Sequence, residues 1–365
     1  MKSSKYILLI ICLFSFLNIK ALTANYDERV ELLSVICNLA DYEEYNMGMA
    51  SEYGEAVARY FEPFKNHVAV NMFKRLEGTK GIGFNAPIDF ALNMKKENNE
   101  FRLDSHNIGD GRWENLDLDA VCDTISMFYK DAEFEKFFKS QVSFYKETCN
   151  QFTDKVLSLI NEKWYPEFYG NEPSENFNVV IGFLTGGCNY GPAIEHPDQP
   201  RDVYAILGYV VLPEKGIMYN FKPEYYRDVL VHEFNHSFVN PYISSEGQFK
   251  KIMEPAGEKL LSQCSTVMEM QAYPEWEIVI NESIVRAAVV CYLLDNGSKE
   301  EVENSIKEEM KVGFWWMPQL VNKMNYYRRT RDKYPTFASY YPELISFFED
   351  ITNATDNEIQ NLFEN

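Results

Sequence analysis

The chain has 365 residues and a formal net charge of −20 at pH 7. Hydrophobic residues make up 46% of it and aromatic residues 15%, which is enough to bury one large core or two smaller ones and excludes a disordered chain. The acidic balance argues against nucleic acid and anionic membrane surfaces as partners, because both require clustered lysine and arginine.

The first residues have the order of a secretory signal peptide. Two lysines precede an apolar run, 6–17, which is followed by a polar break and by small residues at Ala21 and Ala24. The run is shorter than the roughly 20 residues that a membrane-spanning helix needs, and no later stretch is long enough. We therefore predict a signal peptide over residues 1–24, with cleavage after Ala21 or Ala24. The mature protein is then secreted or periplasmic, without stable membrane insertion.

Six cysteines follow the predicted signal peptide, and they are widely separated. None of them forms a C-x-x-C pair, which argues against a cysteine zinc site and against a thioredoxin-like redox motif. An even number of cysteines in an exported chain permits disulfides, but the spacing selects no pairing, and buried free thiols are an equal alternative. The six are Cys37, Cys122, Cys149, Cys188, Cys264 and Cys291.

Residues 25–160 are predicted to form a helical N-terminal region. Val30, Leu33 and Ile36 recur at a spacing of three residues, which places them on one face of a helix. Further helices are predicted over 55–76, 88–96 and 132–159, and the polar segment 97–112 is predicted to be a loop.

Residues 161–365 have a different pattern and form the second predicted region. Two short runs rich in β-branched residues predict strands, and three later segments have the apolar pattern of helices. The strands are predicted over 177–184 and 204–212, and the helices over 224–239, 277–294 and 298–363. The boundary near residue 160 has no low-complexity linker, so the two regions can equally belong to one domain.

The helix 224–239 contains His-Glu-Phe-Asn-His, which has the pattern H-E-x-x-H. His232 and His236 lie one turn apart on one helix face, so both imidazoles can reach one Zn²⁺, and Glu233 points toward the same side. Zinc leaves a position for water and lowers its pKa toward neutrality, and the glutamate can then take the proton during attack on a carbonyl. The pattern predicts one zinc per chain with Glu233 as general base. A surface helix with unrelated histidines and a purely structural metal are the alternatives.

Two histidines and a water leave one zinc ligand to be found. Glu282 is the best candidate, because it stands among apolar neighbours, where an unpaired carboxylate is costly and a metal would remove the cost. Arg286, one helix turn later, can hold this carboxylate by hydrogen bonds. Glu277 is the competing candidate, but an acid at the start of a helix is commonly an exposed residue favoured by the helix dipole.

A donor for the developing oxyanion is also needed in such a site. We predict Tyr273, nine residues before Glu282, for this role. Tyr242, just after the zinc helix, and His196 are alternatives. Because the chain has 24 tyrosines, each tyrosine can equally be a packing residue.

The segment from His232 to His236 and the later Asn281-Glu282 pair resemble the gluzincins, zinc peptidases with H-E-x-x-H on one helix and a glutamate ligand on a later helix. The strings HEFNHSFVNP, NYGPAI and NESIVRA are also similar to an exported bacterial family of unknown function whose members are regarded as gluzincin-type metallopeptidases. This likeness covers most of the mature chain. The chain departs from the thermolysin-like pattern at Arg286, where an aspartate is usual.

The resemblance implies that Glu233 is the general base, that a strand edge above the zinc helix holds an extended peptide, and that a tyrosine or histidine assists the oxyanion. Together with the predicted elements, it indicates an α+β fold that is mainly helical, with a small β-sheet preceding a zincin-type active-site helix pair. The glycine-containing run 182–191 is then either part of the substrate edge or a plain turn after a core strand.

We therefore predict an exported zinc metallopeptidase that hydrolyses peptide bonds with a zinc-activated water and acts on a peptide or protein substrate. One alternative is a zinc hydrolase that acts on a non-peptide amide or ester, since the same residues would serve it. The other is a non-catalytic exported binding protein that contains zinc. The intact Glu233 argues against the latter, because metal binding alone requires no base there.

Overall fold

The computed structural model describes residues 22–47, 52–106, 108–173, 175–196, 199–208, 223–271 and 273–354. The predicted signal peptide therefore lies outside the described residues except for its last three positions. The end of the second predicted strand, 209–212, also lies outside them. Among the described residues, no helix is long and apolar enough to cross a membrane.

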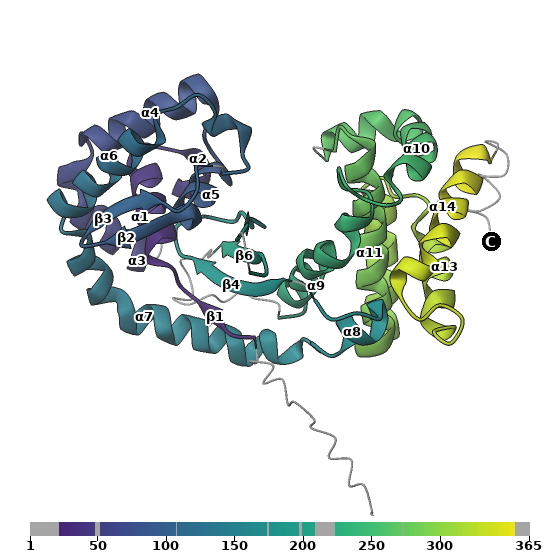
Figure 1. Cartoon of the computed structure of the whole chain (residues 1–365). Coiled ribbons are helices and arrows are strands. Elements are labelled where there is room, and N and C mark those ends of the chain that lie inside the picture. Colours follow the sequence, from purple (N-terminus) through teal and green to yellow (C-terminus); the bar gives the residue numbers. More distant parts are fainter. Residues whose placement is uncertain are drawn as a thin grey trace, which may run out of the picture.

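A small mixed sheet lies at the centre of the molecule (Figure 1). Its strand order is β1-β4-β6-β5, and the first three strands run parallel, whereas β5 is antiparallel to β6. The strands are β1 (Ala24–Asn25), β4 (Asn176–Gly182), β5 (Ala193–Ile194) and β6 (Asp202–Gly208). β1 belongs to the start of the chain, so the sheet joins the N-terminal region to the rest of the protein.

Helices from the first half of the chain cover one side of this sheet, together with a two-stranded hairpin. They are α1 (Glu28–Leu39), α2 (Glu43–Asn46), α3 (Glu52–Phe61), α4 (Val68–Lys80), α5 (Ala86–Asn93), α6 (Leu118–Asp131) and α7 (Phe134–Lys155), with β2 (Met94–Glu97) and β3 (Glu100–Leu103) as the hairpin. Short 3₁₀ turns are η1 (Glu62–Phe64), η2 (Gly111–Trp113) and η3 (Leu157–Leu159). We call α1 to α6 with the hairpin the N-terminal group.

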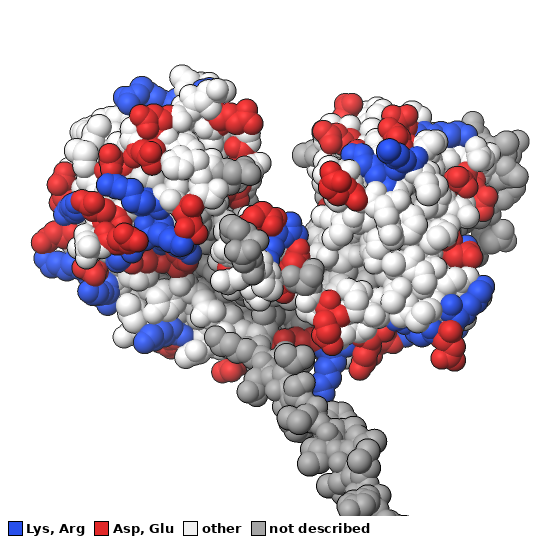
Figure 2. All heavy atoms as spheres, in the orientation of Figure 1, with Lys and Arg blue, Asp and Glu red and all other residues white. Residues whose placement is uncertain are grey.

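Apart from strands β4 to β6, the described elements after residue 160 are helical. These helical elements are α8 (Trp164–Tyr169), α9 (Pro223–Val239), η4 (Asn240–Tyr242), α10 (Lys250–Met270), α11 (Trp276–Asn296), α12 (Lys299–Lys311), α13 (Met317–Arg329) and α14 (Phe337–Asn353). We call α10 to α14 the C-terminal group. The sheet and α9 lie between the two groups, and the space-filling view shows a wide notch there (Figures 1 and 2).

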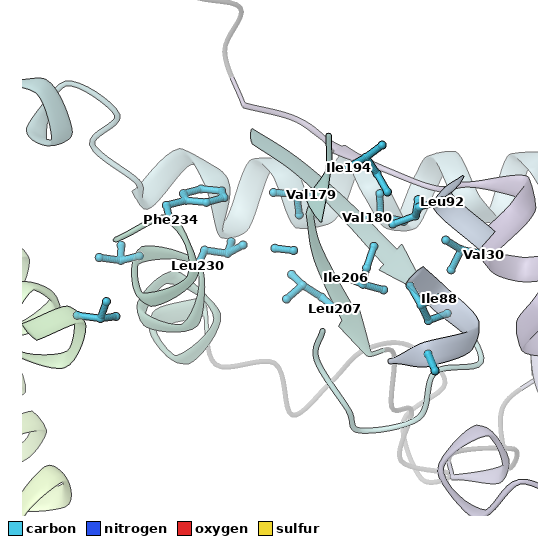
Figure 3. Packing of buried hydrophobic residues seen from close by; sticks show 14 of the residues in the cluster. Val30, Ile88, Leu92, Val179, Val180, Ile194, Ile206, Leu207, Leu230 and Phe234 are labelled. Carbon is cyan, nitrogen blue, oxygen red and sulfur yellow. The ribbon is translucent and has the colours of Figure 1, made fainter. Parts of the chain in front are cut away.

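Buried side chains of the sheet pack on both neighbouring layers (Figure 3). On one side they meet Val30 of α1 and Leu92 of α5, and on the other they meet Leu230 and Phe234 of α9. Strands buried on both faces need nearly continuous apolar sequence, which explains the β-branched run of β4. This packing sets the position of α9 against the sheet.

The predicted fold class is confirmed, since the chain is an α+β protein that is mainly helical with a small sheet. Two local predictions were wrong. The predicted helix 55–76 is two helices, because Pro63 lies between them in η1 and cannot continue an α-helix. The segment 88–112 contains a hairpin, whose turn places Asn98 and Asn99 at positive φ, a conformation that asparagine tolerates and that the loop prediction overlooked.

All six cysteines after the predicted signal peptide are free thiols, and five of them are buried. The division of the chain near residue 160 stays a prediction, although one hydrophobic cluster extends through both regions.

Candidate metal centre

α9 has one buried face and one face that is partly open. Pro223 occupies the first turn, where its missing N–H costs nothing, and Pro241 lies two residues after the last helical residue. Leu230, Phe234 and Phe238 are buried. His232, Glu233 and His236 are only partly buried. The helix therefore presents the H-E-x-x-H side chains away from the core.

α11 lies beside α9 and supplies Glu282 (Figure 1). Most of this helix is buried, and Glu282 is only 7% exposed among apolar neighbours such as Val285. Its carboxylate reaches the two histidines of α9. Glu282 Oε1 lies 3.3 Å from His236 Nε2, and Glu282 Oε2 lies 3.6 Å from His232 Nε2.

The three side chains form a group that could hold a metal ion. The two histidine Nε2 atoms are 3.1 Å apart. A tetrahedral zinc with ligand distances of about 2.0–2.1 Å requires neighbouring ligand atoms to be about 3.3 Å apart. The separation of 3.1 Å between the two Nε2 atoms and that of 3.3 Å between His236 Nε2 and Glu282 Oε1 are close to this edge length, and the other carboxylate oxygen lies 3.6 Å from His232 Nε2.

The orientation of one histidine is fixed from the opposite side of its ring. His236 Nδ1 lies 3.1 Å from Asn240 Oδ1. An amide oxygen can only accept, so this contact places the proton on Nδ1 and leaves a lone pair on Nε2. Asn240, one turn after His236, therefore selects the tautomer that binds a metal.

The electrostatics of the cluster favour positive charge at its centre. Burial raises the pKa of Glu282, but hydrogen bonds and charge from His232 and His236 outweigh it and hold this pKa well below the ordinary value. Burial lowers the pKa of His236, and the neighbouring Glu282 carboxylate more than compensates, so that the net pKa is raised. A cation would satisfy the same carboxylate without protonating an imidazole.

Glu233 lines a cavity of about 440 Å³ together with the three cluster residues. Gly191, just before β5, also lines it. A Cβ added at Gly191 would lie 2.9 Å from Glu233 Oε2, so a larger residue there would require the end of the glutamate side chain to shift. Gly186, in the same glycine-containing run, packs elsewhere, since its Cβ would lie 2.3 Å from the backbone oxygen of Glu44.

The edge of the sheet faces this cavity with outward-pointing backbone groups. Tyr190 and Ile206 exchange both backbone hydrogen bonds, at 2.9 and 2.8 Å, and Pro192 accepts another from β6. Along an antiparallel edge strand, the backbone N–H and C=O groups of successive residues point alternately toward the neighbouring strand and away from it. Tyr190 and Pro192 bond to β6, so the backbone groups of Gly191 and Ala193 point away from β6. Both residues line the cavity.

Tyr273 also lines the cavity, and its hydroxyl donates to Glu282 Oε2 at 3.1 Å. The other sequence candidates lie elsewhere. Glu277 pairs with Lys250 at 3.0 Å. His196 Nε2 is 3.0 Å from Asp202, and the ring of Tyr242 packs against aromatic residues. The structure thus brings together His232, Glu233, His236, Tyr273 and Glu282.

Three residues at or near the site were not singled out from the sequence. Asn240 contacts His236, and its position four residues after this predicted ligand could have indicated the contact. Arg201 lines the cavity and pairs with Glu195 at 3.4 Å. Glu309 contacts Arg286 from the next helix, α12, and no local sequence pattern predicts this contact.

One family model, described as Domain of unknown function (DUF4932), matches residues 22–347, which is most of the chain. The chain belongs to this family. The matched part includes every residue of the metal cluster, and the description of the family names no activity. No curated protein and no solved structure matches the chain.

Proposed function

We propose that this protein is a zinc metallopeptidase of the gluzincin type. The observation that carries the proposal is the group of His232, His236 and Glu282, whose ligand atoms lie within 4.8 Å of one another, with Glu233 in the same cavity. A structural zinc site would instead be closed by four protein ligands. Three ligands beside an acidic residue in a cavity fit a catalytic site better.

Each side chain has a distinct role in the proposed reaction. Bound zinc would supply a Lewis acid and lower the pKa of water. Glu233 takes a proton from the attacking water and passes it to the leaving amine. The backbone at Gly191 keeps this carboxylate against the wall of the cavity. Tyr273 is our candidate donor to the oxyanion, for which it would exchange its hydrogen bond to Glu282 for one to the substrate.

The edge of the sheet favours an extended peptide as substrate over a small amide or ester. The outward backbone groups of Gly191 and Ala193 can pair with a further antiparallel strand, as in recognition by strand addition. A second cavity, of about 570 Å³, continues from the same two residues to Asp89 and Ile108 of the N-terminal group. Successive side chains of such a strand would point alternately toward α9 and away from it.

Export is part of the proposal and rests on the N-terminal sequence alone. A secreted or periplasmic peptidase would meet unfolded or extended polypeptides outside the cytoplasm. The sequence order of positive charge, apolar run, polar break and small residues supports this location.

The experiment that tests the function measures cleavage of an unfolded protein and of a mixed peptide library by zinc-loaded protein. Glu233→Gln should retain zinc and lose roughly 10²–10⁴-fold or more of the turnover, because only the base is removed. Glu224→Gln, an exposed acid on the same helix, is the matched control and should cleave like wild type. His236→Ala should lose both zinc and activity.

Two results would contradict the proposal. If Glu233→Gln with confirmed zinc cleaves as fast as wild type, the assignment of the base is wrong. If zinc-loaded wild type cleaves no peptide but hydrolyses simple esters or amides, the protein is a zinc hydrolase of another substrate class.

A further inference from the structure

Arg286 holds three groups at the metal cluster, one with each nitrogen of its guanidinium. Its Nε donates to Glu282 Oε2 at 3.0 Å, and its terminal nitrogens donate to the hydroxyl of Tyr273 at 3.0 Å and to Glu309 Oε2 at 2.7 Å. The guanidinium also lies over the ring of Phe314, 4.8 Å from its centroid. Because the guanidinium is planar, these contacts define both its position and its orientation.

The contacts divide the two carboxylate oxygens of Glu282 between different partners. Oε2 accepts from Arg286 and from Tyr273 and lies 3.6 Å from His232 Nε2, whereas Oε1 lies closer to a histidine, at 3.3 Å from His236 Nε2. An oxygen that already accepts two hydrogen bonds is a poor metal ligand, so the arrangement favours binding through Oε1 alone. One-oxygen ligation leaves a coordination position open for water.

A different pairing of Arg286 with Glu282 would disrupt this arrangement. Arginine and a carboxylate prefer two parallel N–H···O bonds, and such a pairing is stronger than a single bond. Both oxygens of Glu282 would then face the guanidinium and turn away from the histidines. Tyr273 and Glu309 oppose this, because each accepts a hydrogen bond from one of the two terminal nitrogens of Arg286 and so holds the guanidinium in its present orientation.

Helix α12, which carries Glu309, also contacts α9, the helix that carries the two histidines. Arg227 of α9 is buried and donates to Glu301 of α12 at 2.8 Å. Glu301 also forms a capping box with Ser298 at the start of α12. Glu309 therefore has a defined place relative to α9 as well as to α11.

We propose that Glu309 is a positioning residue of the metal centre: by holding one end of the Arg286 guanidinium, it keeps Glu282 as a one-oxygen ligand that faces the two histidines. The proposal rests on the metal site of the proposed function and is independent of the peptidase activity.

The test measures zinc affinity by competition with a chelator, without any substrate. Glu309→Ala should weaken zinc binding by about 10–100-fold, the range typical for residues that hold a metal ligand. Glu309→Gln keeps an oxygen that can accept from Arg286 and should bind zinc more tightly than Glu309→Ala. Glu308→Ala is the matched control, because Glu308 is exposed on the same helix and pairs with Lys311; its zinc affinity should equal that of wild type.

Two further measurements separate positioning from a general loss of stability. The absorption spectrum of the Co²⁺-substituted protein reports ligand geometry and should change in Glu309→Ala and less in Glu309→Gln. The unfolding temperature of the metal-free variants shows whether the fold is weakened. Support requires a weaker affinity with a changed cobalt spectrum in Glu309→Ala.

Several outcomes would overturn the proposal. Equal zinc affinity in Glu309→Ala and wild type would show that Glu282 needs no such support, even if the metal-free variant unfolds at a lower temperature. A wild-type protein that takes up neither zinc nor cobalt would remove the metal site and this inference together. Zinc uptake without peptide cleavage would contradict only the peptidase function.

Discussion

Glu31 on α1 is fully buried at the end of strand β4, and its protonation should control stability near neutral pH. Its Oε1 accepts from the backbone N–H of Phe183 at 2.9 Å, and its Oε2 accepts from the hydroxyl of Tyr53 at 2.8 Å. The Tyr53 hydroxyl is also 2.8 Å from that of Tyr145. Burial raises the pKa of Glu31 to about 7, and its hydrogen bonds and the charge of Asp27 are smaller influences.

The sign of the effect follows from the higher pKa of Glu31 in the folded protein. The folded protein binds the proton more tightly than the unfolded chain, in which the pKa is 4.5. The free energy of unfolding therefore falls as the pH rises from about 4.5 to about 7 and stays low above that. Because a tenfold change in proton affinity corresponds to about 1.36 kcal/mol, the total loss is on the order of 3 kcal/mol. About 2 kcal/mol of it should appear between pH 5 and pH 8.

The assay compares wild type with Glu31→Gln by urea unfolding at pH 5 and at pH 8. Glutamine can accept from Phe183 and donate to Tyr53, and it has no charge to bury. The difference in unfolding free energy between variant and wild type should thus grow by about 2 kcal/mol in favour of the variant from pH 5 to pH 8. Glu55→Gln, an exposed acid on α3, should show no such growth. A constant difference for Glu31→Gln at both pH values would refute the reasoning.

Three further predictions concern the metal site and the N-terminus. Glu282→Ala should weaken zinc binding far more than Glu277→Ala, and equal affinities would remove Glu282 as third ligand. Gly191→Ala should keep its zinc, measured by metal analysis, and lose about ten-fold or more in turnover, because its Cβ displaces the proposed base. The mature chain should begin at Leu22. The N–H of Leu22 donates to Glu162 Oε1 at 3.1 Å, strand β1 follows it, and the family match starts there. N-terminal sequencing that finds a start after Ala24 would contradict this.

Helix α9 and its pair of histidines could be predicted from the sequence, because both depend on local spacing. Residues four apart on a helix share a face wherever that helix lies in the fold. The place of Glu282 beside the two histidines was also predictable, since a carboxylate inside an apolar helix needs a partner. The strands β4 and β6 were recognisable for a similar reason, as buried strands require unbroken apolar runs.

Three features were not predicted because their local sequence does not distinguish them. They are the hairpin, the break at Pro63 and helix α10. A two-residue Asn-Asn turn resembles an ordinary polar loop until its strands are seen to pair. α10 contains Pro255, and its apolar residues are diluted by charge, so its pattern alone did not predict a helix.

The environment of the ligands was decided by the tertiary structure. Glu309 reaches Arg286 across helices that are separated by a turn, and Gly191 approaches Glu233 because β5 folds back along β6. Neither contact is marked by a regular spacing in the sequence, because each depends on how whole helices and strands pack against one another. Local spacing can therefore indicate which side chains could bind a metal, whereas the groups that contact them are set by the packing of α12 and of the sheet edge.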